Sequence, residues 1–257
     1  MGAILALEFP PVSRLVDWQP LFLKGSPFEV NKVVLLMWLA VAIVLGLFLA
    51  AGRRAKTGLV PSGVQNVVEA GVEFVRTDVI LQTIGPEGMG FTPLLVTVFF
   101  FVFVCNVFEV IPGIQMPVNA RMAIPAFLAI IVWVLFNFIG IKSQGFFGYF
   151  KSMLFPPGVP KFLLPLVALI ELVSTVFVRP FSLAVRLFAN MLAGHLLLVS
   201  FAVLTQALFA ATIVGFVVPF ALLVALTGFE VLVAGLQSFI FVILTAVYIG
   251  GAMHPEH

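Results

Sequence analysis

The chain has 257 residues, of which 62% are hydrophobic and only 9% are charged, and its formal net charge is +2. A soluble domain is roughly one quarter charged, so this composition excludes a water-soluble globular protein, and the long aliphatic runs exclude a disordered chain. The few basic residues form no stripe, which excludes a nucleic-acid partner. The apolar runs are continuous and do not alternate as in a β-barrel, which predicts a single all-α polytopic membrane domain over residues 1–257.

The N-terminal region predicts one membrane span. It has no basic segment ahead of an apolar core, and Pro10 and Pro11 interrupt it, so we expect no cleaved signal peptide. The first apolar run covers residues 33–51 and is followed at once by Arg53 and Arg54. The positive-inside rule places that end in the cytoplasm and the N-terminus outside.

Residues 62–84 predict an amphipathic helix. Valines recur there at helical spacing, while the opposite face carries polar residues, namely Asn66, Glu69, Glu73 and Arg76. The apolar stripe is too narrow for a membrane span, so we expect a helix lying flat at the cytoplasmic interface. A helix packed on a partner protein is the alternative.

Two further apolar segments, 91–111 and 122–141, predict a hairpin of membrane helices. The connection over residues 112–119 is rich in turn-forming residues, and we expect it outside. Lysines at positions 142, 151 and 161 mark the next connection as cytoplasmic.

The C-terminal half consists of two overlong apolar segments, 161–204 and 207–250. A straight helix of 44 residues is about 65 Å long, whereas the hydrocarbon core of a membrane is about 30 Å thick. Each segment is therefore either two short spans or one oblique helix. No polar turn divides either segment, although Pro180 and Pro219 can kink them. We expect two long, steeply tilted helices shaped by a partner, and a cytoplasmic C-terminus.

Polar residues inside these two segments are the candidate functional residues. One helix face carries residues spaced by three, four and four, namely Arg179, Ser182, Arg186 and Asn190. Gly194 continues that face, with His195 beside it, and the second segment carries Glu230 and Gln237 on one face. Ionisable groups cost several kcal/mol at the bilayer centre, so they generally face a partner or water.

Structural roles remain open for these residues. Arg179 can snorkel to a membrane boundary, and Arg186 can belong to a structural ion pair. The His195–Glu230 pair can be structural too. Small polar side chains often only satisfy helix–helix contacts, which applies to Ser182 and Asn190. Two further carboxylates near predicted helix ends can be ordinary solvated groups, namely Glu109 and Glu171.

The run from Arg179 to His195 closely resembles the signature of subunit a of F-type ATP synthases. That signature is Ser-Leu, two residues, Arg-Leu-Phe, a small residue, Asn-Met, two residues and Gly. The stretch from Glu230 through Gln237 to Tyr248 is similar to the family's last helix, and Asn106–Pro112 with Glu109 is similar to its third. The resemblance covers roughly residues 31–250 and is to the bacterial type.

The resemblance implies a proton-channel stator in the bacterial cytoplasmic membrane. Its partners would be the c-ring, subunit b of the peripheral stalk, the rest of the ATP synthase and the lipid bilayer. Two half-channels would load and unload ring carboxylates with H⁺ rather than Na⁺. The chain itself would be non-catalytic, because ATP forms on other subunits, and would need no cofactor or metal.

Roles for individual residues follow from the same resemblance. Arg186 would face the ring carboxylate and keep the half-channels apart, with Gln237 opposite it. Glu230 and His195 would line the outer half-channel, with Asn106 and Glu109 at its mouth. The cytoplasmic exit would use Ser182 and Asn190, and Arg179 is a further candidate for proton translocation.

The chain departs from some relatives in two respects. They place the acid on the fifth helix and the histidine on the sixth, whereas here the two are exchanged. Asn119 and Arg121 stand where some relatives have an acidic residue in the loop before the fourth helix. The entrance of the outer channel can therefore be built differently.

Two other classes of function fit the sequence less well. An autonomous proton-coupled secondary transporter using Arg186 and Glu230 is the main alternative, but the sequence shows no paired repeat. An intramembrane enzyme would need a nucleophile with a base or a cluster of metal ligands, and no such motif occurs.

Overall fold

The protein is almost entirely helical. A computed structural model describes residues 21–22, 29–56, 62–111, 113–155, 160, 162–211 and 215–253. Residues 1–20, for which we expect no signal peptide, lie outside the described residues. Five helical stretches are long and apolar enough to cross a membrane, namely Lys32–Ala55, Pro86–Val107, Ala123–Gln144, Leu164–Phe209 and Val217–Met253. The prediction of an all-α membrane protein with about five membrane-inserted helices is confirmed.

The chain forms two compact units. One contains residues 1–43, 101–121 and 188–237, and the other contains residues 44–100, 122–187 and 238–257. All the boundaries except the one after Arg121 fall inside helices, because α2 (Lys32–Ala55), α5 (Thr92–Val107), α9 (Arg179–Ala211) and α10 (Val217–Met253) each contribute to both units.

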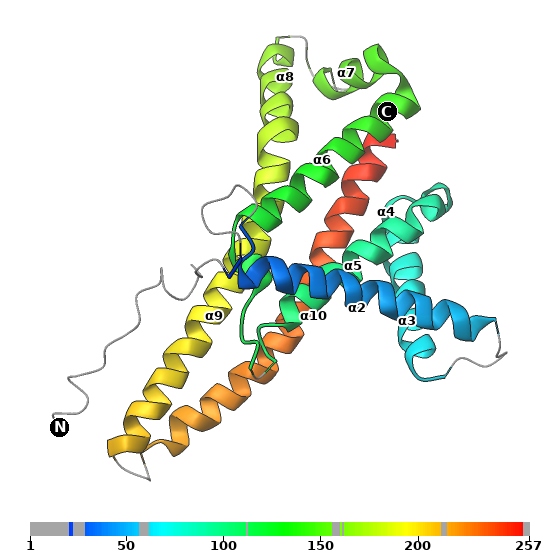
Figure 1. The fold of residues 1–257 in the computed structure, drawn as a ribbon. Helices are drawn as coiled ribbons and strands as arrows, with labels where there is room; N and C mark the ends of the chain where they lie inside the picture. Colours follow the sequence, from blue (N-terminus) through cyan, green and yellow to red (C-terminus); the bar gives the residue numbers. More distant parts are fainter. Residues whose placement is uncertain are drawn as a thin grey trace. The chain divides into compact units, whose positions relative to one another are not determined.

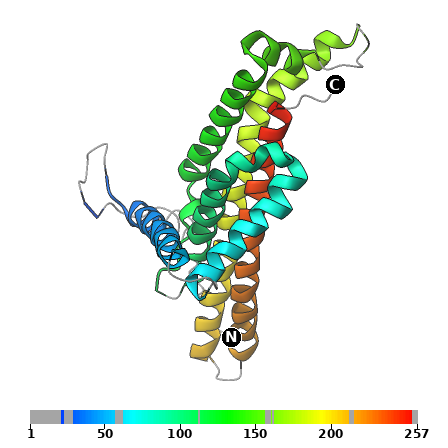
Figure 2. The same cartoon turned by 90° about the vertical axis from the view of Figure 1, so that its right-hand side faces the viewer.

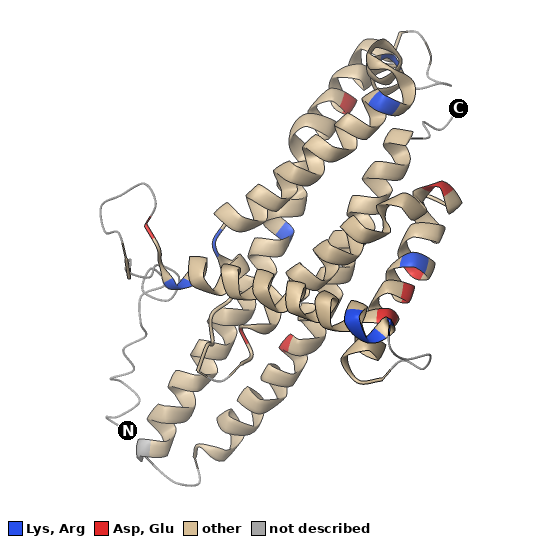
Figure 3. Ribbon diagram, turned by 45° about the vertical axis from the view of Figure 1, so that its right-hand side comes forward, with Lys and Arg blue, Asp and Glu red and all other residues tan. Residues whose placement is uncertain are grey.

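In the first unit, α9 and α10 run antiparallel on either side of their connection. Figures 1 and 2 both show these parts, in yellow and orange, lying side by side. Their ribbons are almost entirely tan in Figure 3, because they carry few charged residues. The start of α2 belongs to this unit as well. The Asn31 side chain accepts a hydrogen bond from the Val34 amide at 3.0 Å and so caps that helix.

The second unit contains the amphipathic helical run. It consists of α3 (Val64–Phe74), a π-helical segment η1 (Val75–Ile80) and α4 (Leu81–Thr83). Val68 and Val75 are buried, while the polar side chains predicted for the other face are exposed. Val67 also falls at the helical spacing of the predicted valine stripe, but it is 60% exposed and is not buried with Val68 and Val75. A 3₁₀ turn, η2 (Pro86–Phe91), leads from this run into α5.

Two further helical stretches belong to the second unit. α6 (Ala123–Gln144) is followed by a short helix that the sequence did not predict, α7 (Phe146–Leu154), after a turn at Gly145 with φ +76°. Next come α8 (Leu164–Val173), the π-helical segment η4 (Ser174–Val178) and the start of α9. The end of α6 is held to the end of α10, because the Gln144 side chain donates a hydrogen bond to the Ala252 carbonyl at 2.7 Å.

The break between the two long helical segments differs from the expected position. The sequence suggested a break at residues 205–206, whereas α9 ends at Ala211 and α10 begins at Val217. The surrounding residues are apolar on both sides, so composition carries no boundary signal there. The segment before Ala211 is helical from Leu164 onward and contains Pro180 near the π-helical η4.

Candidate functional site

Three ionisable side chains come together in the first unit. Glu109 follows the end of α5, His195 lies on α9 and Glu230 lies on α10. All three are buried, with 3%, 7% and 5% of their surface exposed. The Nδ1 atom of His195 lies 3.9 Å from Oε1 of Glu109. The Glu109 carboxylate is therefore not an ordinary solvated group, which was one of the two possibilities left by the sequence.

Gly194 brings the Glu230 carboxylate against α9. A Cβ atom at position 194 would lie 2.7 Å from Cδ and from both carboxylate oxygens of Glu230. Such an approach is shorter than a van der Waals contact, so the carboxylate occupies space that only a glycine leaves open. The sequence pattern places Gly194 on the polar face of its helix. The close approach of the Glu230 carboxylate to Gly194 depends on the position of α10, which that pattern does not give.

Two asparagines extend this cluster. The Asn119 side-chain amide donates a hydrogen bond of 2.6 Å to Oδ1 of Asn106, and both residues are buried. Asn119 lies in the 3₁₀ turn η3 (Val118–Ala120), in the connection that follows α5. The sequence signalled Asn119 only as a departure from an acidic residue, and its pairing with Asn106 was not predicted.

Four buried polar atoms in this cluster make no hydrogen bond to any residue that the structure describes. They are Nδ2 of Asn106, Oε1 of Glu109, Oδ1 of Asn119 and Oε2 of Glu230. Buried polar atoms in proteins are nearly always hydrogen-bonded to protein or water. The cluster defined by Asn106, Glu109, Asn119, His195 and Glu230 is called the acidic cluster below, and its chemistry suits exchange of protons with water.

A second polar pair joins α9 and α10 in the same unit. The Asn190 side-chain amide donates a hydrogen bond to Oε1 of Gln237 at 2.7 Å. Gln237 is 1% exposed, whereas Asn190 is exposed. The hydrogen-bond partner of Gln237 is thus Asn190, which lies one turn after Arg186 on the same helix.

Arg186 lies on the less buried side of α9. Its neighbours Leu183 and Leu187 are buried, while Arg186 is half-buried and Ala189 is exposed. Across the described ranges, the Arg186 side chain makes neither a hydrogen bond nor an ion pair. Ser182 lies on the same side of the helix and its hydroxyl is likewise without a described partner. No ion pair among the described residues accounts for Arg186.

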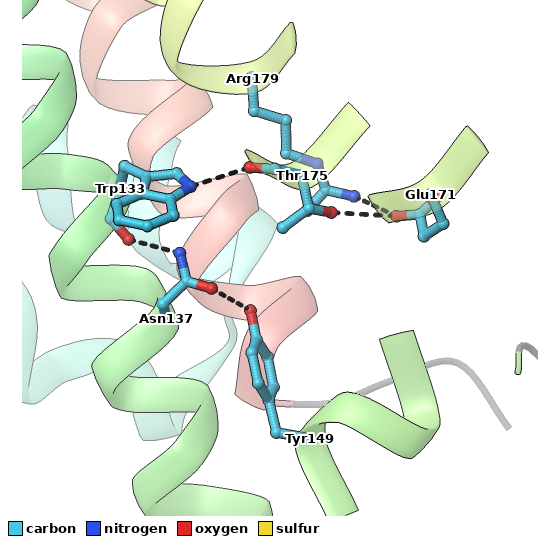
Figure 4. Close-up of polar contacts among 6 residues, drawn as sticks. All are labelled: Trp133, Asn137, Tyr149, Glu171, Thr175 and Arg179. Carbon is cyan, nitrogen blue, oxygen red and sulfur yellow. Dashed lines mark hydrogen bonds and ion pairs between the residues drawn. The ribbon is translucent and has the colours of Figure 1, made fainter. Parts of the chain in front are cut away.

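Arg179, in contrast, is held by its own chain in the second unit (Figure 4). Its Nη2 donates a hydrogen bond to Oε1 of Glu171 at 2.7 Å, and its guanidinium carbon lies 5.6 Å from the centre of the Tyr248 ring. The Trp133 indole N–H donates to the Thr175 carbonyl at 2.9 Å in the same network. The sequence did not single out Trp133.

The candidate residues are therefore divided between the two units. The acidic cluster and the Asn190–Gln237 pair lie in the first unit, whereas Arg186, Ser182 and the Arg179 network lie in the second. Within the residues described, no three His, Cys, Asp or Glu side chains are arranged to hold a metal ion. The chemistry available is proton transfer and charge stabilisation.

Comparison with known proteins gives consistent results. The model of a family described as ATP synthase A chain matches residues 34–250. The chain is 44% identical to ATP synthase subunit a of Frankia alni over 250 residues, which cover 96% of this chain and 86% of the relative. It is 43% identical to the subunit a of Bradyrhizobium diazoefficiens over 259 residues, covering 98% of this chain and 100% of the relative. The subunit a of Streptomyces lividans is 43% identical over 232 residues, covering 88% and 81%.

Proposed function

Because this chain belongs to the ATP synthase A chain family, we propose that it is the stator through which protons enter and leave the rotating ring of an F-type ATP synthase. The observation that carries the proposal is Arg186. A half-buried guanidinium on a predominantly apolar helix, with no partner among the described residues, calls for an anionic partner from another subunit. A carboxylate on a small ring subunit meets this need.

The chemistry of arginine suits this role. A guanidinium keeps its charge at any biological pH, whereas a buried lysine can lose its proton. Arg186 would lower the pKa of a ring carboxylate that faces it and would bar protons from passing directly between the half-channels. A carboxylate must be protonated before it turns into lipid, because burying a bare anion is very costly.

The acidic cluster is proposed as the outer half-channel. Glu230 and His195 would relay protons near the ring, and Asn106, Glu109 and Asn119 would form the entrance. The four unpaired buried atoms support this assignment, since they offer donors and acceptors to a chain of water molecules. The Asn106–Asn119 pair takes the place that the resemblance gives to an acidic residue.

The cytoplasmic half-channel is proposed to use the polar side of α9. Ser182 and Asn190 flank Arg186 by one turn on either side, and Gln237 orients Asn190 by accepting its hydrogen bond. Arg179 is paired with Glu171, so we assign it to positioning rather than to direct proton transfer.

The remaining features follow from the same proposal. The chain would span the bacterial cytoplasmic membrane with its N-terminus outside and its C-terminus in the cytoplasm. It would bind the c-ring and subunit b of the peripheral stalk, and it would be non-catalytic, since ATP would form on other subunits. A membrane potential would supply about 2.3 kcal/mol per proton for each 100 mV.

Photo-crosslinking tests the proposed contact with the ring. A photoreactive amino acid at Ala189, which is exposed three residues after Arg186, should crosslink to a small hairpin subunit that carries a mid-membrane carboxylate. The same amino acid at Phe138, which is 62% exposed on α6, is the matched control and should not capture that subunit. Purification of the chain alone, with no crosslink from Ala189, would favour a transporter instead.

Glu109 gives a pH-dependent prediction. This residue lies beyond the end of α5 at Val107, and burial, with a further contribution from the charge of Glu230, raises the pKa of Glu109 to about 8. A raised carboxyl pKa means that the group is protonated at neutral pH and loses its proton as pH rises through about 8.

We therefore expect the wild-type proton flux to fall as the pH on the outer side rises through about 8. The Glu109→Gln variant stays neutral at every pH and should lack this inflection. Glu73→Gln, on the exposed face of α3, serves as the control and should retain it. The measurement is the rate of potential-driven proton uptake by liposomes as a function of pH. An unchanged pH profile in Glu109→Gln would remove Glu109 from the proposed entrance.

A further inference from the structure

We infer that Trp133 is a positioning residue, which fixes the rotation of the helix that carries Arg186. The inference rests on the proposed function of Arg186, but the contacts that support it lie within the second unit. They join Trp133 on α6 to the π-helical segment η4 (Ser174–Val178), directly before α9 (Figure 4). Segments of π-helix are uncommon and are frequent at functional sites.

The main-chain hydrogen bonds of η4 leave one carbonyl without a main-chain donor. The Arg179 amide donates to the Ser174 carbonyl, five residues earlier, in the π-helical pattern. In that pattern the Thr175 carbonyl would accept from residue 180, which is proline and has no N–H. The Trp133 indole N–H donates to this same carbonyl at 2.9 Å and so replaces the missing donor.

A regular α-helix would leave a different carbonyl unpaired. In that pattern the Arg179 amide would donate to Thr175, and the Val176 carbonyl would face the nitrogen of Pro180. Proline therefore leaves one carbonyl unpaired in either register. The indole of Trp133 stabilises the register in which that carbonyl belongs to Thr175.

The Glu171–Arg179 ion pair supports the same register independently. Residues eight apart in a continuous α-helix point about 80° away from each other, at about 100° per residue. If the π-helical segment takes up about one extra residue, the two side chains behave as though they were seven apart and differ by only about 20°. Arg179 Nη2 and Glu171 Oε1 lie 2.7 Å apart across η4, in agreement with this geometry.

The register sets where Arg186 points. Arg186 follows Arg179 by seven residues in regular α-helix, so it turns together with the start of α9. Loss of the extra residue in η4 would turn α9 by about 100° relative to α8. A guanidinium turned by that angle would no longer face the ring carboxylate that it is proposed to stabilise.

The test is ATP-driven proton pumping by the purified complex in liposomes. Trp133→Phe keeps the ring and removes the N–H, and we expect pumping to fall roughly tenfold, because a buried acceptor loses its donor. Trp38→Phe is the matched control, since Trp38 is 64% exposed on α2, and it should pump normally. In the variant complex, a cryo-EM map should show the Arg179 amide bonded to the Thr175 carbonyl.

Pro180→Ala provides the decisive background, because a main-chain N–H at residue 180 leaves no carbonyl unpaired in either register, so the Trp133 N–H no longer decides between them. We expect the double variant, Trp133→Phe with Pro180→Ala, to pump within twofold of the Pro180→Ala single variant. If Trp133→Phe reduces assembly instead of pumping, Pro180→Ala should restore assembly. An equal loss in both backgrounds, or no loss in either, would overturn the positioning role. Failure of the proposed function is separate, because it would appear as normal pumping by Arg186→Ala in the same assay.

Discussion

Arg186→Ala should abolish proton-driven ATP synthesis while the complex still assembles. Arg186 makes no described hydrogen bond or ion pair within its own chain, so its removal leaves no buried partner unpaired there. The ring carboxylate would lose the positive charge that favours its ionised form, and protons could pass directly between the half-channels. We therefore expect ATP synthesis below about 1% of wild type and an increased passive proton leak.

Two further variants define this experiment. Arg186→Lys should also fail, because an ammonium in an apolar setting can lose its proton and with it the charge. Arg76→Ala is the control, since it removes a guanidinium from the exposed face of the amphipathic run in the same unit. The measurement is ATP synthesis in vesicles energised by an imposed potential. Wild-type synthesis by Arg186→Ala would exclude the mechanism.

Glu230→Gln should slow proton entry without preventing assembly. The amide has nearly the same size as the carboxyl group, so it fits the space that Gly194 leaves beside α9. It cannot take up and release a proton, and loss of a positioned acid–base group typically costs a factor of 10² to 10⁴. We expect the potential-driven proton flux to fall by about 10² or more.

Gly194→Ala tests the same carboxylate without removing it. The added methyl group would displace the end of the flexible Glu230 side chain, and we expect a smaller loss of flux, of about tenfold. Asp78→Asn is the matched control for Glu230→Gln, because it replaces a carboxyl group by an amide at an exposed position of η1. It should have no effect on flux. Glu230→Gln with the flux of wild type would show that protons take another path.

The sequence was sufficient for the number and type of the long helices, because uninterrupted apolar runs leave few alternatives. It was insufficient for their local geometry. α7 follows a turn at Gly145 that composition alone did not reveal, and Pro180 suggested a kink where the structure has a π-helical segment. The π-helical segment depends on which donor reaches the Thr175 carbonyl, and Trp133 supplies that donor from another helix.

The candidate site shows the same division. The charges of Arg186 and Glu230 within apolar runs mark them as candidate functional residues. Ionisable side chains are costly in a membrane, so they are seldom found there without a function. The structure adds which residues meet. The burial of Glu109, its approach to His195 and the Asn106–Asn119 pair join residues far apart in the sequence, and spacing along one helix cannot predict them.

The outer surfaces of α9 and α10 have a consequence for rotation. Most of their exposed large side chains in the first unit are apolar, including Leu197 and Phe209 on α9 and Leu232 and Leu236 on α10. Dispersion contacts are weak individually and have no preferred direction, whereas hydrogen bonds do. A ring that moved along such a surface would break few directional bonds at each step, so friction between the two would be low. Under the proposed function, the angular stopping points of the motor would be set almost entirely by charge.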